Sequence, residues 1–421
     1  MSPEAPSIRH LRPVSPPLAS YLRPAKRDLS FLGQLAAEGL PVGSGVILDA
    51  HLLSEGTLVA AEARERGLEV VLDSKSLELS TVGGFSRRPL ASLPWAGESI
   101  HVPETFLADG QTRMFAMELA ECAVAHEVSA VLAPTHYLND ELDWLDIDSR
   151  LVRELRMALN SVGAQDVPIY YPLASSLATL RGPVRRQVVR LLSSLPIDAV
   201  WLRIHNFGTS SSGPLSLRRY VDLARDLHEL GVPIVAERTG TVGLALLSLG
   251  AVGGIESGIT MGERFDYASL KRSPSGTAFL PPPKVYIPTL GAFLSRSDAE
   301  TLLQRRGMRM HVCQGAGCCQ RGAEDMIANP RRHFVVSRSL EVSELSSLPA
   351  ALRPGRYLES FLRPATDRIT RAMDVVDSLE RDRIRLDRWR GTIGAMLEEA
   401  AEAPPTVSSI PQGQRLRRRS A

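Results

Sequence analysis

The sequence predicts an α/β protein built on a (β/α)8 barrel. From Gly43 onward, short β-branched runs alternate with helical stretches, and eight such runs can be counted. Strands of a parallel sheet are buried on both faces, so they read as continuous apolar runs of this kind. No Gly-rich nucleotide-binding fingerprint follows the first run. Eight βα units therefore favour a closed barrel, and an open doubly wound sheet is the alternative.

The expected elements follow one another in regular order. The eight expected strands are residues 45–49, 69–73, 129–134, 168–172, 198–204, 233–237, 253–257 and 284–288. The expected helices between them are residues 57–66, 112–126, 149–162, 185–193, 216–230 and 241–249.

The chain divides into five segments. Residues 1–42 are rich in proline and are expected to be mostly irregular, with a short helix near residues 29–38. The barrel is expected over 43–300 and a Cys/His zinc-binding subdomain over 301–345. Helices packing back on the barrel are expected over 346–403, because apolar residues there recur at helical spacing. Residues 404–421 are expected to form a disordered basic tail.

Composition places the chain among soluble globular proteins. Hydrophobic residues make up 44% and charged residues 23% of the chain, and the formal net charge is +2. The arginines at 415–419 are expected to be a solvated end, with a phosphate-contacting arm as the alternative. No apolar stretch approaches the roughly 20 residues of a membrane span, and no signal peptide is visible. Three cysteines within seven positions suit a metal site in a reducing cytosol, so a cytoplasmic location is expected.

Several expected strands end in a charged residue, among them Asp49, Asp73, Glu237 and Glu256. The carboxyl ends of barrel strands carry the chemistry in enzymes of this fold. Two carboxylates facing each other across the barrel mouth can perform glycosidic chemistry, one as nucleophile and one moving protons. Asp73 and Glu256 are the expected catalytic pair. The alternative for each acid is a helix cap or a pair with a nearby arginine.

A substrate pocket is expected on the same rim. Ser74 follows Asp73 in a polar turn, and neutral or charged hydrogen-bonding groups end or follow other strands. These groups suit a flat polar ligand such as a base or sugar, although a lone histidine is more often a structural residue. The expected substrate-binding residues are Ser74, His136, Asn139, Arg203, His205 and Glu237.

The segment Cys313-Gln-Gly-Ala-Gly-Cys318-Cys319 is the sharpest local signal. Thiolates from a Gly-containing loop and one imidazole make a closed tetrahedral zinc site. The expected ligands are Cys313, Cys318, Cys319 and His333, with His311 as an alternative fourth ligand. Four protein ligands leave no open position, so such a zinc ion is structural. A bare or redox-active thiol cluster is the alternative.

Three features together resemble the tRNA-guanine transglycosylases, including relatives that insert 7-deazaguanines into DNA. They are residues 72–80 (Leu-Asp-Ser-Lys-Ser-Leu-Glu-Leu-Ser), residues 238–256 and the late Cys/His cluster. The resemblance implies a zinc-containing (β/α)8 barrel that exchanges guanine for a 7-deazaguanine through a covalent glycosyl-enzyme. Asp73 and Ser74 match the start of the family motif Asp-Ser-Gly-Gly-Phe-Gln, which implies acid/base chemistry for Asp73. Glu256 stands where the family has its nucleophilic aspartate.

The chain also departs from the family pattern. Gly-Gly-Phe-Gln does not follow Ser74, although Gly83-Gly84-Phe85 lies downstream. The family's guanine-reading motifs are replaced by residues 170–172 (Tyr-Tyr-Pro) and 203–206 (Arg-Ile-His-Asn). Neither the spacing of the cysteines nor the interval to the histidine matches the family's zinc motif. Base recognition is therefore expected to differ.

The expected function is that of a transglycosylase-like enzyme acting on the N-glycosidic bond of tRNA or DNA. Expected partners are nucleic acid and a 7-deazaguanine-type base, with no membrane. Phosphates are expected to contact Arg87, Arg88, Arg264, Lys271, Arg272 and the helical segment after the zinc site. One alternative is a catalytically inactive zinc-containing barrel that binds nucleic acid or supports a catalytic partner, with self-association left open. A hydrolase or lyase acting on a small molecule is a further alternative.

Overall fold

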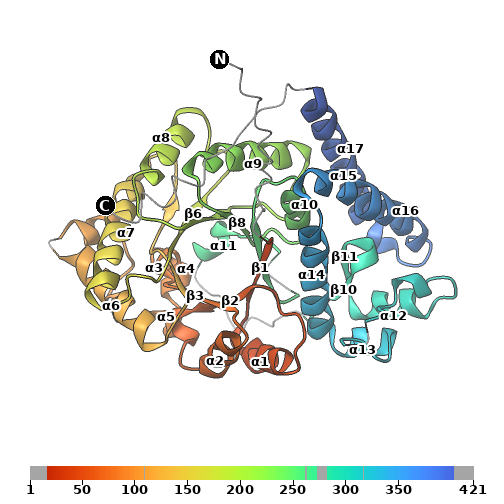
Figure 1. Ribbon diagram of the computed structural model, residues 1–421, viewed down its shortest axis with the longest axis horizontal. Coiled ribbons are helices and arrows are strands. Elements are labelled where there is room, and N and C mark those ends of the chain that lie inside the picture. The colour runs from red at the N-terminus through yellow and green to blue at the C-terminus, as the bar shows by residue number, and fades with distance from the viewer. Residues whose placement is uncertain (1–16, 109, 261–262, 273–281, 316, 403–421) are drawn as a thin grey trace, which may run out of the picture.

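The computed structural model describes residues 17–402, except 109, 261–262, 273–281 and 316. Eight parallel strands form a closed ring, in which each strand pairs with its neighbours and β4 pairs with β6 to complete the circle (Figure 1). This confirms the expected (β/α)8 barrel. The barrel strands are β1 (Ala19–Arg23), β2 (Gly45–Asp49), β3 (Glu69–Asp73), β4 (Ala130–Leu132), β6 (Ile169–Ser175), β7 (Ala199–Ile204), β8 (Ile234–Glu237) and β9 (Gly254–Gly258). The short β5 (Tyr137–Leu138) pairs in parallel with the end of β6.

The first and last expected strands require correction. The barrel begins with β1, inside the segment expected to be irregular, and β1 pairs with both β2 and β9. The run at 284–288 does not enter the barrel. Its central part, β10 (Val285–Ile287), forms an antiparallel hairpin with β11 (Ala292–Leu294). The barrel strands therefore span residues 19–258, and not a segment that begins at 43.

Helices surround the strands (Figure 1). Those between barrel strands are α1 (Leu29–Ala37), α2 (Thr57–Glu65), α3 (Ser76–Leu79), α4 (Val82–Phe85), α5 (Arg88–Ala91), α6 (Gln111–Ala125), α7 (Asp143–Ser161), α8 (Gly182–Leu192), α9 (Pro214–Leu227) and α10 (Val242–Ser248). After β9 follow α11 (Tyr267–Leu270), α12 (Arg296–Gln304), α13 (Ala323–Ala328), α14 (Pro330–Ser347), α15 (Arg353–Arg356), the π-helix η9 (Tyr357–Leu362), α16 (Arg363–Ala372) and α17 (Glu380–Glu402).

The last part of the chain packs on the barrel through α17 and also through α14, which begins inside the segment expected to bind zinc. Helix α14 lies beside β1 (Figure 1), and the Ser346 hydroxyl accepts a hydrogen bond from the Leu18 amide at 3.0 Å. In α17 the buried Trp389 donates its indole N–H to the Ser212 carbonyl at 3.1 Å. The expected tail at 404–421 lies outside the described residues.

The barrel interior is layered. Buried apolar side chains fill its middle, among them Ile47, Val71 and Trp201. Side chains alternate between the two faces of a strand, so residues two positions further along point into the same interior. Those positions are the strand ends Asp49, Asp73 and Arg203. The fold therefore places a charged layer directly above an apolar one, at the carboxyl end of the barrel.

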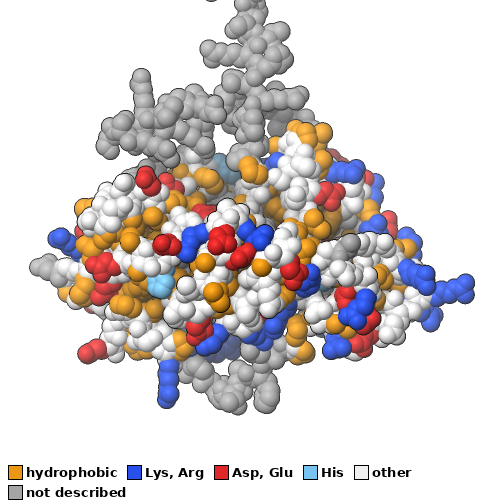
Figure 2. Space-filling view, turned by 60° about the horizontal axis from the view of Figure 1, so that its bottom comes forward, with side chains coloured by type: hydrophobic (Ala, Val, Ile, Leu, Met, Phe, Trp, Pro, Cys, Tyr) orange, Lys and Arg blue, Asp and Glu red, His pale blue; other side chains and the backbone are white. Residues whose placement is uncertain are grey.

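The surface carries both signs of charge. Figure 2 shows Lys and Arg side chains interspersed with Asp and Glu over one face, with cationic side chains gathered at the right-hand edge. This mixture agrees with the small net charge of +2. No helix within the described part of the chain has the length and apolar character needed to cross a membrane.

Helix α4 depends on a glycine at position 84. A Cβ built on Gly84 would overlap the carbonyl of Glu78, which is backbone and cannot move aside. We expect Gly84→Ala to lower the free energy of unfolding by about 1–3 kcal/mol, measured by urea denaturation. The matched control is Gly391→Ala in α17, where nothing lies within 4 Å of the added Cβ. That variant should be neutral or slightly stabilised. Equal effects in the two variants would contradict the steric explanation.

Candidate active site at the barrel mouth

Arg23, at the end of β1, is the centre of a buried ionic network. Its Nη1 lies 2.5 Å from Asp49 Oδ1 and 2.7 Å from Asp73 Oδ2. Its Nε lies 3.1 Å from Glu256 Oε1, and its Nη2 lies 3.5 Å from Glu237 Oε1. The four strand-end carboxylates therefore converge on one point, as their positions at the strand ends predict. The expected catalytic pair, Asp73 and Glu256, contacts the same guanidinium.

Two further buried cations complete the network. Arg203 reaches Asp73 Oδ2 at 2.9 Å and Glu237 Oε1 at 2.7 Å. Lys75 contacts Asp49 at 3.5 Å and also pairs with Glu78. Lys75 has a left-handed backbone, with φ of 62°, which directs the chain sharply away from β3. The same turn lets Asp73 Oδ1 accept the Lys75 backbone N–H at 2.9 Å.

The surroundings shift the pKa values of the two expected catalytic acids in opposite directions. Burial alone would raise the pKa of Asp73, but Lys75, Arg23 and Arg203 together hold that pKa well below its ordinary value. Burial raises the pKa of Glu256, and the neighbouring charge of Glu237 adds to this, against the opposing effect of Arg23. Acids with separated pKa values in one site divide into a proton donor and an ionised partner.

Two oxygens of the strand-end carboxylates have no hydrogen-bond partner among the described residues. They are Oε2 of Glu237 and Oε2 of Glu256, both fully buried. The two glutamates are opposite each other on adjacent strands β8 and β9. A buried polar atom without a partner marks a place for a water molecule or a ligand. The site therefore has free acceptors on the side formed by β8 and β9.

The other expected pocket residues separate into two groups. Arg203 and Glu237 belong to the network described above. Ser74 is buried, with its hydroxyl 3.4 Å from Ser76 Oγ and its carbonyl accepting the Trp95 indole N–H. His205 is half-buried on the loop after β7, where its Nδ1 accepts the Tyr267 backbone N–H at 3.0 Å.

His136 and Asn139 make contacts away from this network. His136 is fully buried, its Nδ1 lies 2.6 Å from Asp148 Oδ1, and its ring stacks on Trp144 at 3.7 Å. Asn139 is exposed and accepts the Leu142 backbone N–H at 3.1 Å, as a turn residue does. These contacts fit the structural alternative for both residues, because His136 is held by Asp148 and Trp144 of α7 and Asn139 by its own loop.

Sequence reasoning missed Arg23, Lys75 and Glu78. The signal for Arg23 is the same as for the acids, since the run Ser20-Tyr21-Leu22-Arg23 is a short strand that ends in a charge. Prolines at 16, 17 and 24 flank this run and make it read as irregular. Lys75 and Glu78 carry no comparable signal, because a left-handed lysine in a turn cannot be read from residue type.

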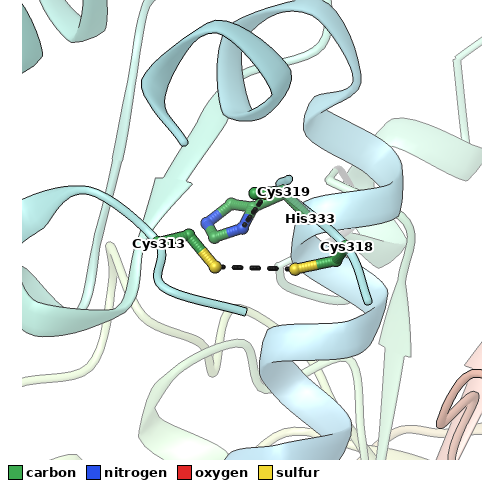
Figure 3. Close-up of side chains that lie close together, drawn as sticks. All are labelled: Cys313, Cys318, Cys319 and His333. Carbon is green, nitrogen blue, oxygen red and sulfur yellow. Dashed lines mark hydrogen bonds between the residues drawn. The ribbon is translucent and has the colours of Figure 1, made fainter. Parts of the chain in front are cut away.

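A second site lies in the segment after the hairpin β10–β11. Cys313, Cys318, Cys319 and His333 place one ligand atom each within 4.8 Å of one another (Figure 3). Cys313 Sγ lies 3.5 Å from Cys318 Sγ, and Cys319 Sγ lies 3.4 Å from His333 Nδ1. Tetrahedral ligands around zinc, with Zn–S bonds near 2.3 Å, are separated by about 3.8 Å. The cluster can therefore hold a metal ion.

The surroundings of the cluster favour metal binding. His333 Nε2 lies 2.9 Å from the Tyr286 carbonyl, so a proton on that nitrogen leaves Nδ1 as a ligand facing the thiols. A Cβ on Gly315 would lie 3.2 Å from Cys318 Sγ and 3.4 Å from Cys313 Sγ, so the loop closes around the sulfurs. His311, the alternative ligand, instead contacts Thr289 Oγ1 at 2.7 Å and lies outside the cluster.

Fold and sites together define a (β/α)8 barrel with a buried ionic network at its mouth and a Cys3His cluster beside it. No model of a known protein family matches the chain, and no curated protein matches it.

Three solved structures illustrate what the fold is similar to. Penicillium canescens endo-1,4-beta-xylanase is 12% identical with a TM-score of 0.37, over 56% of this chain and 81% of that chain. A GH18 chitinase from Pseudoalteromonas aurantia is 13% identical with a TM-score of 0.36, over 56% of this chain and 93% of that chain. A type I 3-dehydroquinate dehydratase from Clostridium difficile is 9% identical with a TM-score of 0.36, over 60% of this chain and 90% of that chain. Likenesses this distant carry no argument about function.

Proposed function

We propose that this protein is an enzyme that acts on the N-glycosidic bond of a nucleic acid, tRNA or DNA, through a covalent carboxylate intermediate. One observation carries the chemistry: Asp73 and Glu256 contact one guanidinium, and their pKa values move in opposite directions. The resemblance of residues 72–80 and 238–256 to transglycosylases supports the substrate class. A 7-deazaguanine-type base is the proposed incoming partner.

The pKa shifts favour a particular division of roles. Ionised Asp73 attacks the anomeric carbon of the sugar, and the bond from that carbon to the base nitrogen breaks as the electron pair leaves with the base. Glu256 gives its proton to the leaving base. In the second half, the incoming base attacks the same carbon, Asp73 is released as a carboxylate, and Glu256 recovers a proton. The resemblance implies the reverse assignment, and the experiment below separates the two.

Arg23 has to move for this chemistry to occur. Its guanidinium binds Asp73 and Glu256 at the same time, so it occupies the space between them. A sugar carbon can reach Asp73 only after that guanidinium leaves. Arg203, which also contacts Asp73, can keep the acid ionised when Arg23 departs.

Cations on the rim support a nucleic-acid substrate. Segment α4–α5, with Arg87 and Arg88, packs against the segment of α11, with Lys271 and Arg272, and all four side chains are exposed. The contact is close, because a Cβ on Gly83 would overlap the Arg272 carbonyl. Both segments follow carboxyl ends of barrel strands, so the cations adjoin the mouth. Such cations position a phosphate backbone without reading sequence.

The Cys3His cluster is proposed to hold a structural zinc ion. Three thiolates and one imidazole are a ligand set that zinc prefers, and four protein ligands leave no position for a substrate. The ion would join the loop at 313–319 to α14, since the ligands come from those two segments. No catalytic step depends on it.

A second function is favoured by the filled mouth. Arg23, Arg203 and Lys75 together pair with the four strand-end carboxylates, so three cations offset most of the carboxylate charge without a ligand. A catalytically inactive zinc-containing barrel that binds nucleic acid, or that supports a catalytic subunit, would have such a mouth. In that protein the network would serve stability alone.

The test is formation of an adduct that survives denaturation. The full chain is mixed with guanine-containing stem-loop RNA or DNA, with and without a 7-deazaguanine base, and analysed on denaturing gels and by peptide mapping. We expect the adduct on Asp73, its loss in Asp73→Asn, and about 100-fold slower formation in Glu256→Gln. The control Glu229→Gln, an exposed acid in the short 3-10 turn after α9, should behave as wild type.

The remaining outcomes are equally informative. An adduct mapped to Glu256, absent in Glu256→Gln, would support the roles that the resemblance implies. Nucleic-acid binding without any adduct or base exchange would reject the enzyme and support the inactive barrel.

A further inference from the structure

A short segment after β9 crosses the barrel mouth. Residues 263–272, which we call the strap, include α11, and Figure 1 shows α11 inside the ring of strands. At one end of the strap, the Phe265 carbonyl accepts the backbone N–H of Asn206, on the loop after β7, at 2.9 Å. At the other end, α11 packs against α4, which follows β3. Around the ring, β4 and β6 separate β3 from β7 on one side and four strands separate them on the other, so the strap spans the opening.

Phe265 of the strap covers Arg203 of the ionic network. The centroid of its ring lies 5.9 Å from the guanidinium carbon, and the residue is 3% exposed. It forms a buried apolar cluster with Leu77 and with Ala174, which stands opposite Arg203 on the neighbouring strand. Ion pairs are stronger where an apolar cover excludes water. The strap therefore closes the mouth over Arg203 and its partner Asp73.

A substrate cannot reach Asp73 while this cover is in place. The Asp73 side chain is 5% exposed, and it belongs to β3, a strand paired with β2 on one side and β4 on the other. Such a strand cannot move without breaking the barrel. The strap lies outside these pairings and meets the rim through two isolated bridges, His205 with Phe265 and Gly208 with Arg264. Segments held by few hydrogen bonds open at a lower free energy than core strands, so the strap is the part of the cover that can move.

The backbone leading into the strap is strained. Thr260 has a φ of 60°, a left-handed conformation that is unfavourable for a β-branched side chain. Strained residues of this kind cluster at switch regions, where surrounding contacts hold them in place. On the strap itself, Tyr267 is half-buried and stacks on Tyr137 of the rim, with ring centroids 3.7 Å apart. The strap is therefore held closed by its contacts with the rim.

We propose that the strap is a lid, which swings off the barrel mouth before a nucleotide reaches Asp73. The inference rests on the proposed function, because it describes how the substrate enters that site. The closed lid keeps water from the network, and the open lid exposes Arg203 and Asp73. Lids over active sites commonly serve both purposes, since they sequester the reaction and admit the substrate.

A thiol placed beneath the lid reports its opening. Ala174 is fully buried under Phe265, and Ala174→Cys places a small thiol there without changing a charged residue. The full-length variant is treated with iodoacetamide, and labelling is followed by peptide mapping. We expect this thiol to react at least about 100-fold more slowly than an unprotected cysteine, because labelling waits for the lid to open. The half-buried Cys122 in α6 is the internal reference.

Two further changes should open the lid from opposite ends. A Cβ built on Gly83 of α4 would overlap the carbonyls of Leu270 and Arg272, so Gly83→Ala pushes against the backbone of the strap alone. Phe265→Ala removes the apolar plug over Arg203. Each change, made in the Ala174→Cys background, should speed labelling of the new thiol by at least about tenfold, with Cys122 unchanged.

Matched controls separate lid opening from a general loss of stability. Gly391→Ala adds a methyl group where nothing lies within 4 Å, and Phe115→Ala removes a similarly buried phenylalanine from α6. Both should leave labelling of the thiol slow. A thiol that is unprotected without either opening change, equal labelling in Gly83→Ala and Gly391→Ala, or equal labelling in Phe265→Ala and Phe115→Ala would each overturn the lid. The measurement uses no nucleic acid, so a missing adduct in the earlier test would reject the enzyme without altering the result for the lid.

Discussion

Replacing Arg23 with leucine should cost about 3–5 kcal/mol of unfolding free energy, measured by urea denaturation at pH 8. Removing one partner of a buried ion pair leaves an uncompensated charge, and that is the usual size of the effect. Here one guanidinium contacts four carboxylates that are almost completely buried, apart from a slightly exposed Asp49. The control is Arg225→Leu, which breaks an exposed pair with Asp222 and should change stability by less than about 1 kcal/mol.

The loss of unfolding free energy in Arg23→Leu should be larger at high pH than at low pH. In the wild-type protein the pKa values of Asp49, Asp73 and Glu237 are lowered, despite burial, by cations that include Arg23. A lowered pKa contributes stability above the unfolded value, near 4, that is lost as pH falls through the folded value. The raised pKa of Glu256 has the opposite effect on stability, but three carboxylates have lowered pKa values and only this one has a raised value.

Without Arg23, burial should raise the pKa values of these carboxylates, because less positive charge opposes desolvation. A raised carboxylate pKa favours the folded state as protons are added. The variant should therefore recover stability between pH 8 and pH 5, so that its deficit relative to wild type narrows. A deficit equal at both pH values, or no deficit, would show that the network does not hold these charges together.

Wild-type protein should contain about one zinc ion per chain, and removal of the ion by a chelator should lower the Tm by about 10 °C. The expected size follows from zinc-binding free energies of about 10 kcal/mol and a Tm shift of about 1 °C per kcal/mol for a chain of this length. Cys313→Ser and Cys319→Ser should lose the metal and show the same lowered Tm. The measurements are elemental analysis and differential scanning calorimetry.

The fourth cysteine provides the control. Cys122 is half-buried in α6 and lies outside the cluster. We therefore expect Cys122→Ser to retain the zinc and to have a Tm close to that of the wild-type protein. A wild-type protein free of zinc, or an equal loss of metal from Cys122→Ser, would contradict the assignment. In that event the thiol cluster would stand as the remaining alternative.

Much of the barrel could be predicted from the chain alone. Runs such as Val70–Asp73 and Val200–Arg203 are apolar over most of their length and end in charge, because both faces are covered and the carboxyl end opens at the mouth. The run near 285 looks the same locally, yet β10 turns back into a hairpin. Local pattern cannot distinguish a barrel strand from any other buried strand, since both are apolar for the same reason.

The four members of the Cys3His cluster were predictable because thiols and imidazoles close together along the chain have few uses other than metal binding. His333, fourteen residues after Cys319, was within reach because a loop and a helix suffice to bring it back. For the mouth, only the acids were predictable. Arg23 was missed because its contacts with Asp73 and Glu256 span 50 and 233 residues, and no local signal reports such pairs.

By itself, then, the sequence determined the alternation of strands and helices, the charges at the strand ends and the four members of the Cys3His cluster. These depend on residue type and on short separations along the chain. Only the tertiary structure decided that β1 closes the barrel, that Arg23 binds four carboxylates at once, and that Asp73 and Glu256 acquire opposite pKa shifts. Those outcomes depend on distance and burial in three dimensions, because the energy of a charge is set by what surrounds it in the folded protein.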